Sequence, residues 1–191
     1  MSVDLEATME KAVALADFID AAREVVSVML NVSAMPALAV FADREYQQGQ
    51  RVGQGRQVEA AEQADIMIGV PLTEGAVHFE IDVPETGDGA WLMVIDGAAE
   101  GWGSGREAVF SPYRTCVGVT LAAGLALATA QLAEGRYIDE QIGMLRGRHE
   151  PAQVISRTRL PGRGDDFAIQ CEKYVRQFSH LNGWPEDRSM R

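Results

Sequence analysis

The sequence lacks the residue patterns that usually reveal a chemical reaction. Its 191 residues include three histidines and two cysteines, and Cys116 and Cys171 stand 55 positions apart without a CxxC pair. We therefore expect two reduced, buried thiols. Neither Ser104 nor Cys116 lies in a nucleophile elbow or a recognisable Cys–His context, so no motif for nucleophilic catalysis is present.

The first residues, MSVDLEATMEK, lack the basic segment and following apolar run of a secretory signal, so we expect a cytoplasmic protein. An uncharged run of 19 residues from Thr115 to Ala133 approaches the length needed to cross a bilayer. The run is rich in Ala, Gly and Thr and contains Gln131, which favours a buried helix packed closely on a sheet.

Positive charge is absent from the middle of the chain. Residues 57–105 contain ten carboxylates and no Lys or Arg, within a net charge of -11. Such a field repels nucleic acid and anionic membranes and attracts basic partners, although an acidic surface can also serve solubility alone. Five arginines lie close together later in the chain, without aromatic residues between them: Arg146, Arg148, Arg157, Arg159 and Arg163. Their simplest role is to form ion pairs with the acidic half of the same chain.

With 47% hydrophobic and 24% charged residues, the chain is typical of one globular domain over 1–191. We expect a helical N-terminal part over 1–64, a sheet over 66–111 and C-terminal helices over 112–191. The helices expected from periodicity and capping signals span 3–31, 36–48, 57–64, 111–134 and 165–180. Ser111 and Pro112 would open the fourth of these, and residues 136–139 form a short strand.

Four short runs of β-branched and aromatic residues, at 66–70, 76–83, 91–96 and 107–111, predict an antiparallel meander. The fold class is therefore α+β, with an antiparallel sheet of about four strands and helices packed mainly on one face. In 76–83, the alternation directs Phe79 and Ile81 to one face and His78, Glu80 and Asp82 to the other. The second face of the sheet is then expected to be solvated and acidic.

The stretch GAAEGWGSGRE at 97–107 resembles a phosphate-binding loop only superficially. Its glycines fit G-x-G-x-G, and a predicted strand follows where a dinucleotide fingerprint requires a helix N-terminus. A hairpin connection explains the glycines better. Trp102 within it either folds back onto the sheet or waits for a partner.

His78, Glu80 and Asp82 are residue types that bind metal ions. Three side chains on one strand rarely converge on one ion, so we expect a binding face with no metal and no cofactor. The sequence leaves open an enzyme or small-ligand carrier with a site between sheet and N-terminal helices. It also leaves open a homo-oligomeric adaptor, for instance a homodimer formed by the N-terminal helix.

In size, charge, α+β layout and an Ala-rich helix ending in EGRYIDE, the chain resembles the small acidic immunity proteins that bacteria keep against interbacterial toxins. The resemblance implies a protein that is no enzyme and whose acidic patch covers the basic active site of a toxin. Complementary charge would speed the encounter, and buried aromatic anchors would hold the complex. The predicted partner-binding residues are Glu74, His78, Glu80, Asp82, Glu100 and Trp102.

Overall fold

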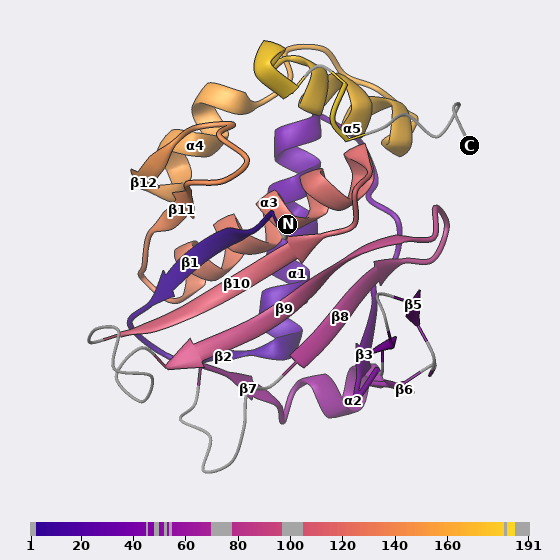
Figure 1. Cartoon of the computed structure of the whole chain (residues 1–191), viewed down its shortest axis with the longest axis vertical. Helices are drawn as coiled ribbons and strands as arrows, with labels where there is room; N and C mark the ends of the chain where they lie inside the picture. The colour runs from indigo at the N-terminus through magenta and orange to yellow at the C-terminus, as the bar shows by residue number, and fades with distance from the viewer. Residues whose placement is uncertain are drawn as a thin grey trace.

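The computed structural model describes residues 3–44, 46–47, 50–51, 53, 55–69, 78–96, 105–181 and 183–185. Helices and strands are mixed along the chain (Figure 1). The helices are α1 (Leu15–Leu30), α2 (Ala60–Gln63), α3 (Cys116–Leu132), α4 (Pro151–Thr158), α5 (Phe167–Arg176) and the 3-10 helix η1 (Ser179–Leu181). The strands are β1 (Leu5–Met9), β2 (Val13–Ala14), β3 (Ala39–Ala42), β4 (Tyr46–Gln47), β5 (Gln50–Arg51), β6 (Arg56–Gln57), β7 (Met67–Ile68), β8 (His78–Val83), β9 (Asp88–Asp96), β10 (Arg106–Pro112), β11 (Tyr137–Asp139) and β12 (Gly147–His149).

The fold is α+β, as predicted, but its main sheet is larger than expected. Eight strands, not about four, form it in the order β12-β11-β1-β10-β9-β8-β3-β6. Every neighbouring pair in this sheet is antiparallel. The predicted meander is its centre, β8-β9-β10, whereas β7 pairs with β2 in a separate two-stranded sheet. The sheet is therefore not confined to 66–111.

The helix expected over 3–31 is wrong in its first half. The sequence LEATM forms β1, whose alternate residues Leu5, Ala7 and Met9 are buried. Strand β1 lies inside the sheet, paired with β10 on one side and β11 on the other. Helix α1 begins only at Leu15 and ends where Asn31 adopts a left-handed conformation with φ 54°.

The helix expected over 36–48 is also wrong. Residues 39–42 form β3, which pairs with β8 and β6 and buries Val40 and Ala42. Helix α3 begins later than predicted, because Ser111 and Pro112 still belong to β10. Its N-cap is Thr115, whose hydroxyl oxygen accepts a hydrogen bond from the Gly118 N–H at 2.9 Å.

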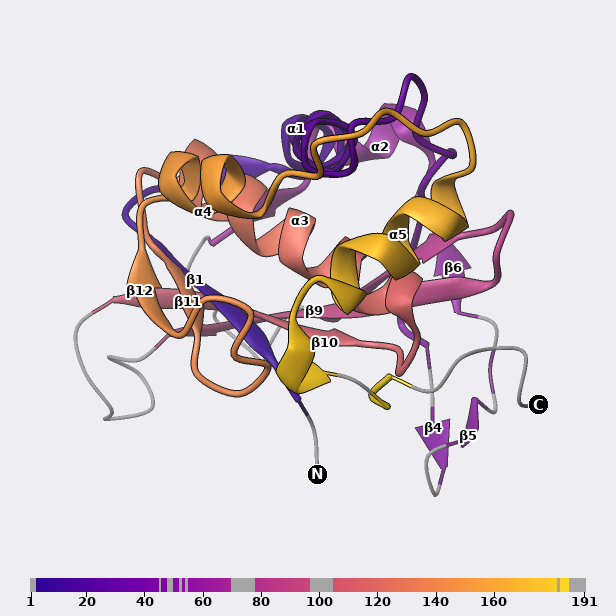
Figure 2. The same cartoon turned by 90° about the horizontal axis from the view of Figure 1, so that it is seen from above.

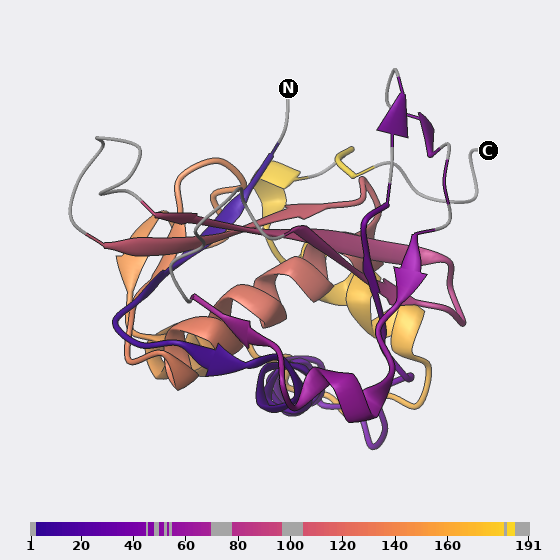
Figure 3. The same cartoon turned by 90° about the horizontal axis from the view of Figure 1, so that it is seen from below.

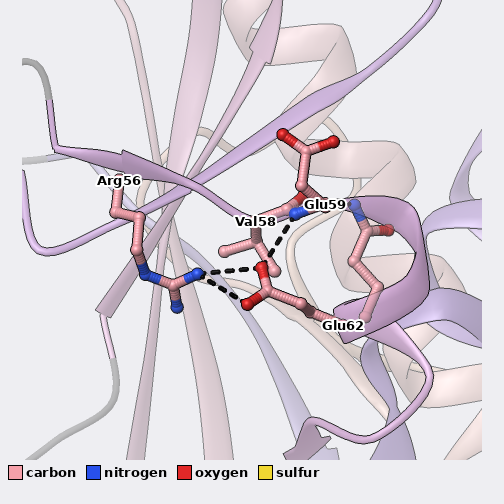
Figure 4. A network of polar contacts seen from close by, with 5 residues as sticks. Arg56, Val58, Glu59 and Glu62 are labelled. Carbon is pink, nitrogen blue, oxygen red and sulfur yellow. Dashed lines mark hydrogen bonds and ion pairs between the residues drawn. The ribbon is translucent and has the colours of Figure 1, made fainter.

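Three shorter predictions are confirmed: the strand β11, the last amphipathic helix α5, and the helical piece within 57–64, which is α2. At α2, Glu62 accepts hydrogen bonds from Arg56 and from the Glu59 N–H (Figure 4). These hydrogen bonds lower the pKa of the Glu62 carboxyl below its ordinary value. Because both side chains of the Arg56–Glu62 ion pair are about half exposed, the pair adds little stability.

Helix α3 lies between the sheet and α1, with α4 and α5 beside it (Figure 2). It packs against β1, β9, β10 and β11 on one side and against α1 on the other. This central position explains why residues 117–130 are all buried and why, apart from Thr120 and Thr129, they are apolar on every side of the helix. A Cβ on Gly124 would stand 2.1 Å from Val26 Cγ2, so α1 approaches α3 where a side chain is missing. Among the described residues, no helix is both long and apolar enough to cross a bilayer.

Candidate functional site

The α-helices lie on one side of the main sheet, whereas the short helix η1 lies towards its other side (Figures 2 and 3). The β4–β5 hairpin projects from the β3–β6 end on that second side (Figure 3). Among the described residues, no α-helix covers the area over β1, β10 and β9 on this second side. We call this area the open face; its side chains are Glu6, Thr8, Trp91, Met93, Ile95, Glu107 and Val109.

Strand register aligns one row of side chains across the open face. Val109 stands opposite Glu6 on β1 and opposite Met93 on β9. The row continues beyond Met93 to His78 on β8, and beyond Glu6 to Ile138 on β11 and Arg148 on β12. Partners across an antiparallel pair are about 5 Å apart, so the row from His78 to Glu6 forms one continuous surface, whereas Ile138 beyond it is buried. Its centre is apolar and partly exposed, and charged residues flank it.

Two further rows run beside the first. Glu107 stands opposite Thr8 and Ile95, and Ser111 stands opposite Trp91. All of these side chains are partly exposed, while the intervening residues Ala108 and Phe110 are buried against the helices. Exposed apolar side chains bordered by polar ones are typical of protein interaction sites. The open face therefore has the composition of a binding surface.

Glu6 is the most perturbed carboxyl on the open face. Partial burial raises its pKa above the ordinary value, and the charges of Glu107 and Asp4 raise it further. Arg148 acts in the opposite direction, but its guanidinium is 3.8 Å from the Glu107 carboxylate and serves both. Asp4 in turn accepts a hydrogen bond from the Ser111 hydroxyl. Like charges are thus held side by side at a cost in stability, which is common at functional sites.

Replacing Glu6 with glutamine should raise the thermal midpoint of unfolding at pH 7. The folded pKa of Glu6 is above its ordinary value of 4.5, so its ionisation destabilises the fold. That cost is absent below pH 4.5, grows as the pH rises through the raised pKa, and is constant above it. The thermal midpoint of Glu6→Gln should therefore be higher than that of the natural chain at pH 7, and the two midpoints should converge at pH 4. Glu24→Gln, on the exposed side of α1, is the control, and a lower midpoint for Glu6→Gln at pH 7 would contradict this account.

Glu80 and Asp82 do not form the solvated acidic face expected from the sequence. Arg44 Nη1 lies 2.8 Å from Glu80 Oε2 and 2.9 Å from Asp82 Oδ2. The exposed fractions of the Arg44, Glu80 and Asp82 side chains are 5%, 1% and 15%. One guanidinium thus pairs with both carboxylates inside the protein, and because these side chains are largely buried they are poor candidates for direct contact with a partner.

Local structure holds Arg44 in place from both sides. Its guanidinium carbon lies 3.5 Å from the centroid of the Phe41 ring. On the other side is Gly55, where a Cβ would stand 2.4 Å from Arg44 Cγ and where φ is +65°. Only glycine suits that conformation and that contact. The cluster thus fastens the end of β3 to β8.

The other predicted site residues have mixed outcomes. His78 is exposed and ends the first row of the open face. Glu74, Glu100 and Trp102 lie outside the described residues, and their roles stay predictions. Strands β9 and β10 are antiparallel and pair up to Asp96 and Arg106, so a strand follows the glycine stretch, as predicted. The predicted hairpin connection at 97–104 lies outside the described residues.

Asp139, on β11, has a structural role. The buried Asp139 carboxylate accepts hydrogen bonds from the Gly143 N–H at 2.6 Å and the Leu145 N–H at 3.0 Å, which folds the β11–β12 connection. Burial and the charge of Asp139 raise the pKa of the Tyr137 hydroxyl far above its usual range. Across the described ranges, no group of His, Cys, Asp and Glu side chains is arranged to hold a metal ion.

Sequence reasoning missed Glu6, Glu107, Met93 and Val109 as candidate site residues. The alternation of apolar and polar residues in 91–96 and 107–111 does indicate which side chains share a face of the sheet. Without the register between strands, however, no sequence pattern shows that these side chains adjoin Glu6.

Comparisons of the chain with protein-family models, with curated proteins and with solved structures found no match.

Proposed function

We propose that this protein binds a basic protein partner through the open face and thereby neutralises it, as an immunity protein neutralises a toxin. The observation that carries the proposal is the first row, in which partly exposed Val109 and Met93 adjoin the destabilised carboxylate of Glu6. A cationic side chain from a partner would relieve the repulsion between Glu6 and Glu107. Apolar contacts with Met93, Val109 and Trp91 would supply the rest of the binding energy.

Charge favours a different protein over a second copy of this chain. The net charge is -11, and two copies facing each other through Glu6 and Glu107 would repel. A basic partner gains from the same field, which accelerates association at low ionic strength. The toxin as partner rests on the resemblance in size, charge and layout to immunity proteins.

A comparative capture experiment tests the proposal. The natural chain should retain a basic protein from an extract of its host, and Met93→Arg, which adds bulk and positive charge to the centre of the open face, should not. Glu24→Arg, on α1, is the control and should retain the protein like the natural chain. Equal retention by Met93→Arg would refute the open face as the binding surface.

Expression of the captured protein then tests neutralisation separately. Alone it should arrest the growth of a test strain, and co-expression with the natural chain, but not with Met93→Arg, should restore growth. If the captured protein did not arrest growth, the partner would not be a toxin, but the assignment of the open face as the binding surface would still hold.

A further inference from the structure

The two cysteines lie on helices that pack against each other. Cys116 is the first residue of α3 and is partly exposed, whereas Cys171 in the middle of α5 is fully buried. Helices α3 and α5 are in contact, and Figure 2 shows α5 beside the start of α3. Both cysteines are thiols in the structure.

Thr120 connects the two thiols. It follows Cys116 by one helical turn, so the two side chains lie on the same side of α3. The Thr120 hydroxyl donates a hydrogen bond to the Cys116 carbonyl at 2.8 Å, and the same side chain is a hydrogen-bonding neighbour of the Cys171 sulfur. The Cys171 thiol therefore lies beside the residue that follows Cys116 by one helical turn.

The surroundings of the two thiols differ, and the difference predicts that Cys116 reacts with an oxidant before Cys171 does. Cys116 is accessible to solvent and stands at the N-terminal end of a long helix, where backbone N–H groups favour an anion. Burial raises the pKa of the Cys171 thiol well above its usual range, so Cys171 reacts poorly with an oxidant in solution. Cys171 is, however, on the helix that packs against α3, close enough for the charge of Cys116 to act on it.

We propose that Cys116 and Cys171 are a peroxide-sensitive pair that closes an intramolecular disulfide between α3 and α5. The Cys116 thiolate attacks one peroxide oxygen, the O–O bond breaks, and a sulfenic acid and hydroxide form. The Cys171 sulfur then attacks the sulfenic sulfur, and its proton leaves with the displaced hydroxide as water. Overall, two thiols are oxidised to one disulfide and one peroxide is reduced to two waters.

The start of α3 can adjust to the geometry of a disulfide. Bonded cysteines have Cα atoms about 4.4–6.8 Å apart, and the first turn of α3 can shift to meet that distance from α5. That turn has few intrahelical bonds to break, because its N–H groups lack partners within the helix. Since Cys171 is held as a neutral thiol, the second step is the slow one, and the Cys116 sulfenic acid accumulates before it.

Treatment of the full-length protein with hydrogen peroxide tests the pair. We expect a mass loss of about 2 Da, one linked peptide pair containing Cys116 and Cys171, and a rise in the thermal midpoint of roughly 5 °C. Dimedone added early should label Cys116 and block the disulfide.

Single variants serve as controls in the same assay. Cys171→Ala should keep Cys116 as a dimedone-reactive sulfenic acid, and Cys116→Ser should leave Cys171 reduced. Three results would overturn the proposal: no oxidation of the natural chain, oxidation of Cys116 to the sulfinic acid with Cys171 still a thiol, or a disulfide between two chains.

Discussion

Replacing Arg44 with methionine should lower the free energy of unfolding by about 3–5 kcal/mol. The change leaves the buried Glu80 carboxylate, and Asp82 beside it, without the guanidinium that lies within 2.9 Å of both. Two adjacent carboxylates must then either stay charged in a poorly solvated place or take up protons. Denaturant unfolding at pH 7 measures the loss.

The matched control is Arg56→Met, which removes the Arg56–Glu62 ion pair at the start of α2 (Figure 4). Both partners there are about half exposed, so the loss should be far smaller than that for Arg44→Met. In the triple variant Arg44→Met, Glu80→Gln, Asp82→Asn, much of the stability should return. An Arg44→Met variant as stable as Arg56→Met would show that the ion pairs of Arg44 with Glu80 and Asp82 do not stabilise the contact between β3 and β8.

Reversing the charge of Glu6 and Glu107 to lysine should slow association with the captured partner about tenfold or more at low salt. The pair contributes two negative charges beside Val109, and the double variant replaces them with two positive charges in the same place. Rate constants measured across ionic strengths should also show a flatter salt dependence than those of the natural chain, because screening then has less attraction to remove.

The control for this variant is Glu24→Lys with Glu172→Lys, which changes the net charge equally. Both residues are exposed, on α1 and α5, on the side of the sheet away from the open face (Figure 2). If both double variants slowed association alike, net charge alone would account for the effect and the open face would have no special role.

The sequence predicted correctly those helices and strands whose hydrophobic pattern fits only one type of secondary structure. The uncharged run in α3 is too apolar for a surface position, and the alternation in β8 correctly directs Phe79 and Ile81 to the core. Strand β1 was misassigned because Leu5 and Met9 are four residues apart, a spacing that fits one face of a helix and also one face of a strand. Only pairing with β10 and β11, from distant parts of the sequence, decides between them.

The candidate site was less predictable than the fold, for a similar reason. The outward direction of Glu80 was correct, since it stands opposite Trp91 and Phe41, but its exposure was not. Arg44, which buries it, is 36 positions earlier in the sequence and follows a segment read as a helix. The adjacency of Glu6 and Glu107 likewise depends on a register that no local pattern encodes.

Hydroxyl-radical footprinting of the complex tests the central claim most directly, because Met and Trp side chains react readily with the radical. Met93 and Trp91 on the open face should be protected when the partner binds, while Met67 on β7, which is 43% exposed, should react as in the free protein. Protection of Met67 with unchanged reactivity of Met93 and Trp91 would place the partner elsewhere and contradict the account.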